Sequence, residues 1–579
     1  MHRDFLRTHR GLRGYLARAL GRLGPTWSAS PERRLVQSVC LFIFMALFFW
    51  VCWPYGTREY AKTFAAREIV NGELFLILDP LVSVSAAVAA RMFVWSLAVA
   101  AGVILVGVLL PRAFCGYVCP LGTLIDVFDW LLGKAGRPSA FGQRGWWSGV
   151  RYYLLAVVLI AAGSGVLLSG FVAAIPVLTR AMLFVAAPFQ MGLAKGWYLV
   201  PPANVGHVIS IALLMLVFCL GLLGRRFWCN HLCPTGALLS VCALLRLTER
   251  RVTRACVECG RCVKVCSFAA INDDFATRPL SCTSCRTCAG VCPTKAIEFP
   301  WRRKRENGGA NDGRVEDQTI RSRRNVLAGL GGAVVAGLGA SLAAGGACTS
   351  AEAPIRPPGS VPEDKFLQLC VRCGQCIKVC PNNVLQPAGL EYGFNGLWTP
   401  EVVPDWSGCE PSCNNCGQVC PTGAVRALDI EEKRVARIGL AEVDWITCLP
   451  HAGREACQLC VDECRMAGYN AIEFVRVGGR VDEMGEPLED SGYLAPVVRQ
   501  DRCVGCGLCQ MRCRGINVKS RRLLQRSAIR VFAGAGKEDR IVSGSYRALR
   551  EGREGLRPEH QGRIDEAGGT DEYLPGFLR

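Results

Sequence analysis

The spacing of the cysteines constrains this chain more than any other feature. Of its 33 cysteines, 24 fall into six groups of four along 579 residues. Four groups have the spacing C-x2-C-x2-C-x3-C, and the other two differ at the first interval, which is C-x3-C or C-x8-C. The thiols of such a tight loop are expected to bind one common metal centre. The groups are, in chain order, Cys256, Cys259, Cys262 and Cys266; Cys282, Cys285, Cys288 and Cys292; Cys370, Cys373, Cys376 and Cys380; Cys409, Cys413, Cys416 and Cys420; Cys448, Cys457, Cys460 and Cys464; and Cys503, Cys506, Cys509 and Cys513.

The spacing indicates 4Fe–4S clusters. It is the run of two-cluster bacterial ferredoxins, in which the fourth cysteine of each group ligates the other cluster. Structural zinc prefers two separated C-x2-C pairs and fits this pattern poorly, as do disulfides. We therefore predict six 4Fe–4S clusters. The first two are expected to be held by Cys256, Cys259, Cys262 and Cys292, and by Cys282, Cys285, Cys288 and Cys266.

Two cofactor questions follow from the same pattern. The last four groups pair either in chain order, or first with fourth and second with third, and the sequence leaves both open. Haem is not expected, because the chain has no C-x-x-C-H for a c-type haem. Only His207 lies within an apolar run, which is too few for a bis-histidine b-type haem.

Long apolar runs predict a membrane domain. The mean hydropathy is +0.24 and 51% of the residues are hydrophobic. A helix needs about 20 apolar residues to cross a bilayer. Two runs, Leu74–Ala90 and Met182–Trp197, are shorter or broken, and we expect re-entrant or periplasmic helices there. Four runs are long enough to span: Leu35–Trp53, Met92–Leu110, Tyr152–Ile175 and Val205–Gly224.

The charge distribution predicts the orientation. Residues 1–346 carry a net charge of +21 and residues 347–579 carry −2, within a total of +19. The basic residues flank apolar runs, so they indicate a cytoplasmic membrane face rather than nucleic-acid binding. The N-terminal half is therefore expected to face the cytoplasm of a bacterial inner membrane.

A short motif occurs twice in the apolar half. RAFCGYVCPLG at Arg112–Gly122 follows the second predicted span, and RRFWCNHLCPTG at Arg225–Gly236 follows the fourth. A duplicated two-helix unit explains this repeat. If helical, the two thiols of each motif share one face, because they are four residues apart. Three roles are open for these thiols: they bind a further cluster, they form a redox disulfide, or they are buried thiols that only pack at the helix starts. These four cysteines are Cys115, Cys119, Cys229 and Cys233, whereas Cys40, Cys52, Cys219 and Cys242 are expected to pack in apolar surroundings.

A twin-arginine motif stands in mid-chain. Arg323 and Arg324, with Ser322 and Leu327, form S-R-R-x-x-L before a Gly/Ala-rich run that ends at Cys348. This pattern is typical of a twin-arginine export signal. A domain that receives its clusters in the cytoplasm has to cross the membrane folded, which favours export. A fifth span and a linker are the alternatives, and cleavage near Ala347 is left open.

The predicted fold class is a multidomain membrane protein. It combines an α-helical transmembrane bundle with α+β ferredoxin domains of the bacterial type. The tail is rich in Gly, Arg and acidic residues, so partial disorder is expected there. The segments are a basic N-terminus (1–34), a four-helix membrane domain (35–250), a cytoplasmic two-cluster ferredoxin (251–300), a linker (301–320), the export signal or fifth span (321–348), a periplasmic four-cluster domain (349–530) and the tail (531–579).

The motifs carry a family resemblance. Residues 35–300 resemble the NapH/MauN type of membrane ferredoxin, and residues 321–530 resemble the NapG/MauM type. The resemblance implies a fused quinol dehydrogenase component. It takes electrons from quinol or menaquinol and feeds a periplasmic reductase or cytochrome, typically a nitrate reductase.

Other functions remain open, and the catalytic residues are unknown. The alternatives are a redox maturation or regulatory protein that resembles the NosR and CcoG branches, and a polyferredoxin subunit without its own quinone site. Asp79 and His207 are ionisable residues in apolar surroundings, which are candidates for a functional site. An Asp-Pro turn at the membrane surface and a histidine at a helix end are the simpler explanations, and we favour them over a functional site.

Overall fold

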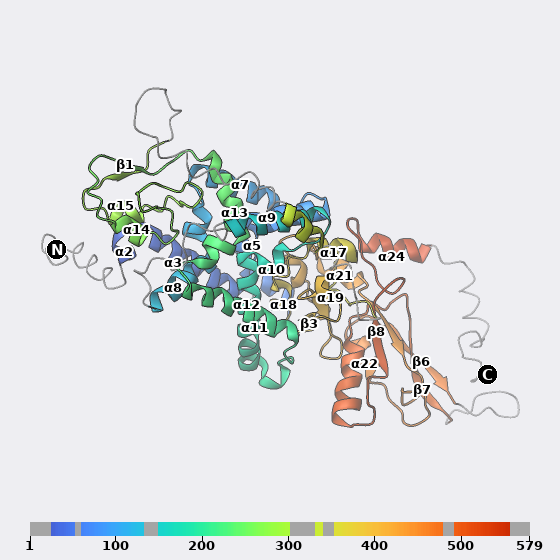
Figure 1. Cartoon of the computed structure of the whole chain (residues 1–579). Coiled ribbons are helices and arrows are strands. Elements are labelled where there is room, and N and C mark those ends of the chain that lie inside the picture. Colours follow the sequence, from blue (N-terminus) through green and yellow to red (C-terminus); the bar gives the residue numbers. More distant parts are fainter. Residues whose placement is uncertain are drawn as a thin grey trace. The chain divides into compact units, whose positions relative to one another are not determined.

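The computed structural model describes residues 25–51, 59–132, 149–301, 331–339, 352–478 and 491–555 (Figure 1). The twin arginines Arg323 and Arg324, the region near Ala347, Cys348 and Cys52 lie outside the described residues. The chain divides into two compact units. Unit 1 comprises residues 1–351, 363–402 and 415–425, and unit 2 comprises residues 352–362, 403–414 and 426–579.

This division cuts through the region expected to be a separate four-cluster domain. Residues 363–402 and 415–425 pack with the apolar helices, and only the remainder forms unit 2. The third cysteine group therefore belongs structurally to the helical domain. Sequence alone gave no sign of this, because the group has the same spacing as the others.

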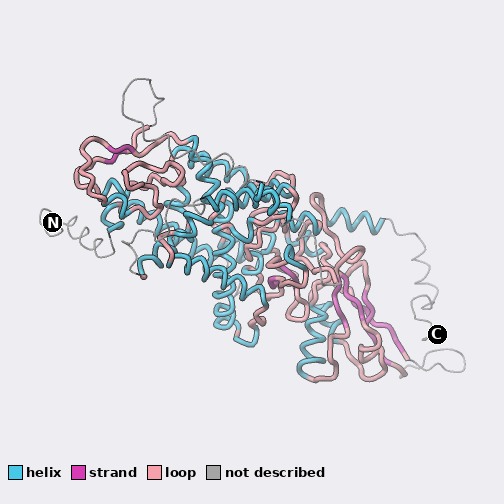
Figure 2. The backbone as a smooth tube through the Cα atoms, in the orientation of Figure 1, coloured by secondary structure: helices cyan, strands magenta, loops and turns pink. Residues whose placement is uncertain are grey.

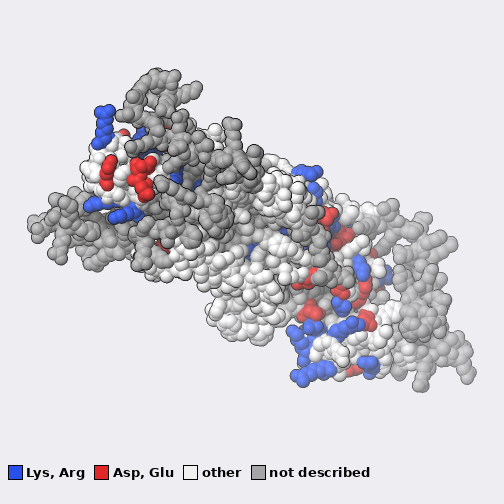
Figure 3. Space-filling view, viewed as in Figure 1, with Lys and Arg blue, Asp and Glu red and all other residues white. Residues whose placement is uncertain are grey.

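Unit 1 is built mainly from helices. Two segments before the Cys-Pro pairs, Phe114–Val118 and Trp228–Leu232, form single π-helical turns. On the face shown in Figure 3, charged side chains are sparse over these helices. The helices are α2 (Pro25–Ala29), α3 (Pro31–Ala46), α4 (Tyr60–Arg67), α5 (Leu74–Ile77), α6 (Pro80–Ala90), α7 (Ser96–Leu109), α8 (Pro120–Leu131), α9 (Val150–Gly163), α10 (Ser169–Val172), α11 (Ala174–Lys195), α12 (Val205–Cys219) and α13 (Pro234–Cys242).

The lengths of these helices correct part of the span prediction. By length and composition, the described residues contain three helices that could cross a membrane: Pro31–Val51, Ala174–Lys195 and Val205–Leu222. The longest helices within the predicted spans Met92–Leu110 and Tyr152–Ile175 are α7 and α9, each of 14 residues. Four spans are therefore not confirmed.

Two local features explain the difference. The run Tyr152–Ile175 is interrupted after Gly163, where Gly165 adopts a positive φ of 90°, a conformation that favours glycine and ends a helix. The broken helix expected at Met182–Trp197 is wrong, because α11 runs through Pro188 for 22 residues. Neighbouring helices commonly stabilise such an internal proline in an apolar bundle.

The ferredoxin parts of unit 1 follow a repeated local design. A residue with positive φ follows the second cysteine of a group and begins a short helix that carries the third. Gly260 (φ 68°) precedes α14 (Arg261–Val265) and Gly374 (φ 79°) precedes α18 (Gln375–Lys378). Glycine suits this conformation because it has no Cβ. The other elements are α15 (Thr287–Gly290), α17 (Glu363–Leu369), α19 (Gly393–Gly396), α20 (Asn415–Gln418) and the antiparallel pairs β1 (Arg251–Val252) with β2 (Ile297–Glu298) and β3 (Leu385–Pro387) with β4 (Pro400–Val402).

Unit 2 contains two antiparallel strand pairs, drawn in magenta in Figure 2, with short helices beside them. In the pair β6–β7, Ile472 lies opposite Val498, and in β5–β8, Leu440 lies opposite Phe532. This mixture of short helices and strand pairs is the α+β arrangement expected for ferredoxin domains. Its elements are α21 (Ile430–Val435), β5 (Leu440–Val443), α22 (Leu459–Met466), β6 (Ile472–Val477), β7 (Tyr493–Val498), α23 (Leu508–Cys513), β8 (Ile529–Phe532) and α24 (Tyr546–Gly555).

Candidate iron–sulfur sites

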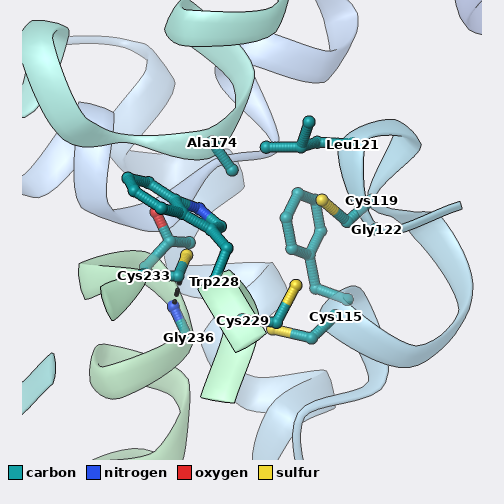
Figure 4. A pocket seen from close by; sticks show the side chains of 11 residues that line it. Cys115, Cys119, Leu121, Gly122, Ala174, Trp228, Cys229, Cys233 and Gly236 are labelled. Atoms are coloured by element: carbon teal, nitrogen blue, oxygen red, sulfur yellow. Dashed lines mark hydrogen bonds between the residues drawn. The ribbon is translucent and has the colours of Figure 1, made fainter. Parts of the chain in front are cut away.

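The two repeated Cys-Pro motifs meet in one cavity, which we call the four-thiol cavity (Figure 4). Cys119 and Cys233 each cap the N-terminus of the helix that follows, with proline at its first position. Each motif therefore bends at a π-helical turn instead of continuing as the straight helix that the i, i+4 argument assumed. None of the four thiols is in a disulfide. The cavity is lined by Cys115, Cys119, Cys229 and Cys233, together with Phe114, Leu121, Gly122, Ala174, Trp228, Thr235 and Gly236.

Two fully buried arginines connect the repeats reciprocally. Arg226 Nη1 donates to the carbonyl oxygen of Cys115 at 3.1 Å, and Arg112 Nη2 donates to that of Cys229 at 3.4 Å. Each arginine thus contacts the first cysteine of the other motif. A Cβ added to Gly122 would lie 3.3 Å from Arg226 Nη1, so glycine leaves room for this guanidinium.

The two arginines differ in their compensating charge. Arg226 makes two hydrogen bonds to the carboxylate of Asp126, at 2.6 and 2.8 Å, and Arg34 also donates to Asp126 at 2.6 Å. Burial raises the pKa of Asp126, but the surrounding arginines outweigh it and hold this pKa well below its usual range. In contrast, the hydrogen bonds of Arg112 described by the structure go to backbone carbonyls, and its Nε has no partner.

The first ferredoxin segment packs directly against this arrangement. Arg112 Nη1 donates to the carbonyl of Ser281, which precedes Cys282. The ring of Phe268, just after Cys266, lies 5.4 Å from the guanidinium carbon of Arg112 and 4.5 Å from that of Arg226. The four-thiol cavity and the second cysteine group are therefore neighbours within unit 1.

The cysteine groups of the ferredoxin parts assemble with exchanged fourth members. We name each assembly by its first ligand, and three of them line cavities. These are the Cys256 site (Cys256, Cys259, Cys262, Cys292), the Cys448 site (Cys448, Cys457, Cys460, Cys513) and the Cys503 site (Cys503, Cys506, Cys509, Cys464). The exchange between the last two groups favours pairing in chain order, one of the two schemes that the sequence left open.

Two further assemblies are assigned by the same exchange of fourth cysteines, because Cys266 lies within electrostatic range of Cys288 and Cys420, together with Cys416, lies within range of Cys376. They are the Cys282 site (Cys282, Cys285, Cys288, Cys266) and the Cys370 site (Cys370, Cys373, Cys376, Cys420). Cys380 and Cys416 belong to unit 1, whereas Cys409 and Cys413 belong to unit 2.

The environment of the thiols fits thiolate ligands. The fourth cysteine of a group accepts a backbone N–H bond at Cys266, Cys292, Cys420 and Cys464, at 3.2 to 3.4 Å. Among the described residues, no group of three or more His, Cys, Asp or Glu is arranged around a single metal ion.

A buried lysine shows how charge is balanced in unit 2. Lys433 is 4% exposed, and its Nζ donates to the carbonyl of Glu410. Burial alone would lower the pKa of Lys433. The negative charges of the thiolates of Cys409, Cys413 and Cys506 outweigh this effect, so the pKa is raised overall. A cation beside cluster cysteines is thus stabilised by the thiolates themselves.

The two ionisable residues noted in the apolar runs have structural positions. Asp79 is fully buried, caps α6 through Leu81 N at 3.1 Å, and accepts a hydrogen bond from Thr235 at the four-thiol cavity. It is an Asp-Pro cap, but it lies in the interior. His207 lies in the first turn of α12 and forms a capping box with Asn204.

Sequence reasoning missed the contacts of several charged residues. It treated Arg112 and Arg226 only as part of the repeated motifs and of the basic N-terminal half, and it did not consider Asp126. The repeated arginine before each C-x3-C-P motif was an available signal for the reciprocal contact. No sequence signal marked Asp126, because its partners are distant along the chain.

A set of cysteine variants tests the exchanged ligands. Because Cys513 lines the Cys448 site, Cys513→Ala is expected to remove the electron paramagnetic resonance (EPR) signal that Cys460→Ala also removes. Cys464→Ala is expected to remove the signal shared with Cys506→Ala. Comparison of the four reduced spectra checks this. If Cys513→Ala and Cys506→Ala removed the same signal, each group would hold its own cluster.

The folded ligand runs and the apolar helices define the class of protein, a ferredoxin-type iron–sulfur electron-transfer protein. A family model described as a 4Fe-4S binding domain matches residues 92–138 and again 205–250, which covers both C-x3-C-P motifs. A model described as a 4Fe-4S dicluster domain matches residues 369–424. No solved structure matches the chain.

Relatives of both halves are found among known proteins. The ferredoxin-type protein NapH of Haemophilus influenzae is 32% identical over 40% of this chain and 79% of its own length. The methylamine utilization ferredoxin-type protein MauM of Paracoccus denitrificans is 37% identical over 28% of this chain and 66% of its own length, slightly less than two thirds. YccM of Escherichia coli, named as an electron transport protein, is 27% identical over 46% of this chain and 73% of its own length. The chain belongs to this family of ferredoxin-type proteins and is a fusion of the NapH and MauM types.

Proposed function

We propose that the chain passes electrons from the quinol pool through its iron–sulfur clusters to a periplasmic reductase, with a nitrate-reductase system as the favoured acceptor. Oxidation of one quinol releases two electrons and two protons, and clusters of this type carry single electrons. The resemblance to NapH and MauM proteins supports the electron-transfer role. The donor and the acceptor are part of the proposal.

One observation carries the proposal. A single hydrophobic core of unit 1 includes Cys119 and Cys233 of the four-thiol cavity, and also Val371, Cys373 and Val419 of the Cys370 site. The Cys282 site packs against the same cavity through Arg112. Two ferredoxin regions that are far apart in sequence are thus held on one scaffold. Such fixed packing suits electron transfer within the chain.

We further propose that the four-thiol cavity holds an additional metal-bound redox centre. A buried cation is costly unless an anion compensates it. Arg112 is fully buried beside these thiols, and its described hydrogen bonds go only to carbonyls. Four metal-bound thiolates supply negative charge, whereas a disulfide supplies none. The match of a 4Fe-4S family model to both motifs supports the same assignment.

Our proposal places the chain in a bacterial inner membrane. The N-terminal half then faces the cytoplasm and the C-terminal ferredoxin region faces the periplasm. The three apolar helices and the basic N-terminal half support this orientation. A periplasm-specific reporter enzyme joined after residue 360 should be active, and a cytoplasm-specific one should be silent. The reverse result would remove periplasmic delivery.

Quinol oxidation is the direct test of the function. The full chain, purified anaerobically in detergent, is expected to show bleaching of cluster absorbance when a menaquinol analogue is added without any other protein. The matching quinone should appear at one equivalent per two electrons. If the clusters are reduced by dithionite but by quinol only after a second subunit is added, the chain has no quinone site of its own.

A further inference from the structure

Arg180 of α11 is a fully buried cation next to the Cys370 site. Its Nη1 donates to the carbonyl of Arg372 at 3.1 Å, the peptide group directly before Cys373. Nη1 also donates to Gly170 O at 2.8 Å, and Nε donates to Ser210 Oγ at 3.1 Å. A membrane-domain side chain is thus bonded to the ligand loop of an iron–sulfur site.

The hydrogen bonds of Arg180 leave its charge uncompensated. In the described part of the chain its hydrogen-bond acceptors are two carbonyls and one hydroxyl, and Nη2 is buried without a partner. The guanidinium carbon lies 3.6 Å from the ring centroid of Trp398, which supplies a cation–π contact. Neither carbonyls nor a ring replace the counter-charge that a buried guanidinium requires.

Two more buried cations are part of the same ligand loop. Arg372 and Lys378 are 1% and 2% exposed, and they lie beside the rings of Phe171 and Phe48 at 4.6 and 5.2 Å. These residues belong to the loop itself, whereas Arg180 reaches it from a membrane helix. Three buried cations therefore belong to or contact the ligand loop of the Cys370 site.

The fit of the loop on the helices is close. A Cβ added to Gly170 would lie 2.5 Å from the carbonyl oxygen of Val371, so only glycine allows this approach. The indole N–H of Trp398 donates to Gly206 O at 2.7 Å. The distance between Arg180 and the ligand loop is therefore set by packing on both sides.

From these contacts we propose that Arg180 is a positioning residue that raises the reduction potential of the cluster at the Cys370 site. Four thiolates outweigh the positive charge of a 4Fe–4S core, so the site is anionic and gains a further negative charge on reduction. A fixed cation in a low-dielectric interior stabilises the reduced state more than the oxidised state. An electron in the membrane domain is therefore drawn to this site. The inference rests on the proposed assignment of these four cysteines to one cluster.

A redox titration followed by EPR tests the proposal on the purified full chain. The signal of the Cys370 site is first assigned by its loss in Cys376→Ala. Arg180→Met is then expected to lower the reduced-to-oxidised ratio of this signal at least tenfold at a fixed potential. That corresponds to a midpoint about 59 mV lower for a one-electron couple. The midpoints of the other clusters should not change.

Matched variants separate charge from packing. Arg180→Lys keeps the charge and should restore most of the midpoint, and Ser210→Ala removes one hydrogen bond of Arg180 and should leave the midpoint nearly unchanged. If Arg180→Met does not assemble the site, Arg180→Gln gives the same comparison. Loss of the site in both neutral variants but not in the lysine variant also supports a requirement for the charge.

Several results would overturn the inference. An unchanged midpoint in the neutral variants, an equal shift in Arg180→Lys, or loss of the site in all three variants would show that Arg180 acts by packing alone. Failure of the cluster assignment has a different signature, because Cys376→Ala would then remove no signal. Failure of the proposed quinol reaction would not affect this experiment, because the midpoint potentials are measured with chemical mediators and need no quinol.

Discussion

Asp126→Asn is expected to destabilise unit 1 by about 3–5 kcal/mol, the usual cost of removing one partner from a buried ion pair. Asp126 binds Arg226 at 2.6 Å and Arg34 at 2.6 Å, and Arg33 lies 3.5 Å away. The asparagine would leave these buried cations without a counter-charge. Thermal unfolding of the purified protein in detergent, followed by the loss of cluster absorbance, measures the effect.

Asp129 on the same helix provides the matched control. Burial raises the pKa of Asp129 to about 6, with smaller contributions of both signs from Asp126 and the arginines. Its charged form is thus disfavoured by folding, so Asp129→Asn should not destabilise unit 1 at pH 7. Equal destabilisation by both variants would contradict the central role of Asp126.

The two carboxyl groups also predict opposite pH dependences. The folded pKa of Asp126 is depressed, so its stabilisation is fully present above its unfolded value of about 3.9 and is lost only as the pH falls below that. The folded pKa of Asp129 is raised to about 6, so its destabilising effect is present above pH 6 and is relieved between pH 6 and 4. Unfolding midpoints of the two variants between pH 4 and 8 check this.

The double variant Cys119→Ser, Cys233→Ser is expected to abolish quinol-driven reduction of the Cys370 site. Both thiols belong to the core that joins the four-thiol cavity to Cys373. Serine is nearly isosteric, but as a ligand it does not replace a thiolate. The iron content should fall by the iron of one centre, while dithionite still reduces the remaining clusters. Iron analysis and stopped-flow absorbance measure the two effects.

Cys242→Ser is the control for this experiment. Cys242 lies on α13, at its last residue, and does not line the cavity. This variant should keep both the iron content and the rate of quinol-driven reduction. An unchanged iron content in the double variant would show that the four thiols hold no iron centre, and the uncompensated charge of Arg112 would then need another explanation.

The cysteine ligands could be found from the sequence because they lie close together along the chain. A cluster needs three thiols on one tight loop, and the positive φ at Gly260, Gly374 and Gly507 is encoded by glycine itself. The helical membrane domain was also predictable, because apolar length is a local property. The number of helices long enough to span was not, because it depends on interruptions such as Gly165 and on the uninterrupted passage through Pro188.

The sequence by itself determined the iron–sulfur chemistry, the apolar helices and the repeat of the Cys-Pro motif, because each depends on residues that are close together along the chain. Tertiary structure alone favoured one pairing of the last cysteine groups, and it alone decided that the Cys370 site packs with the apolar helices of unit 1. It also decided that Arg112, Arg226 and Arg180 are buried beside thiols. Electrostatic compensation acts between residues that are close in space, so the meaning of a buried charge becomes visible only once the chain has folded.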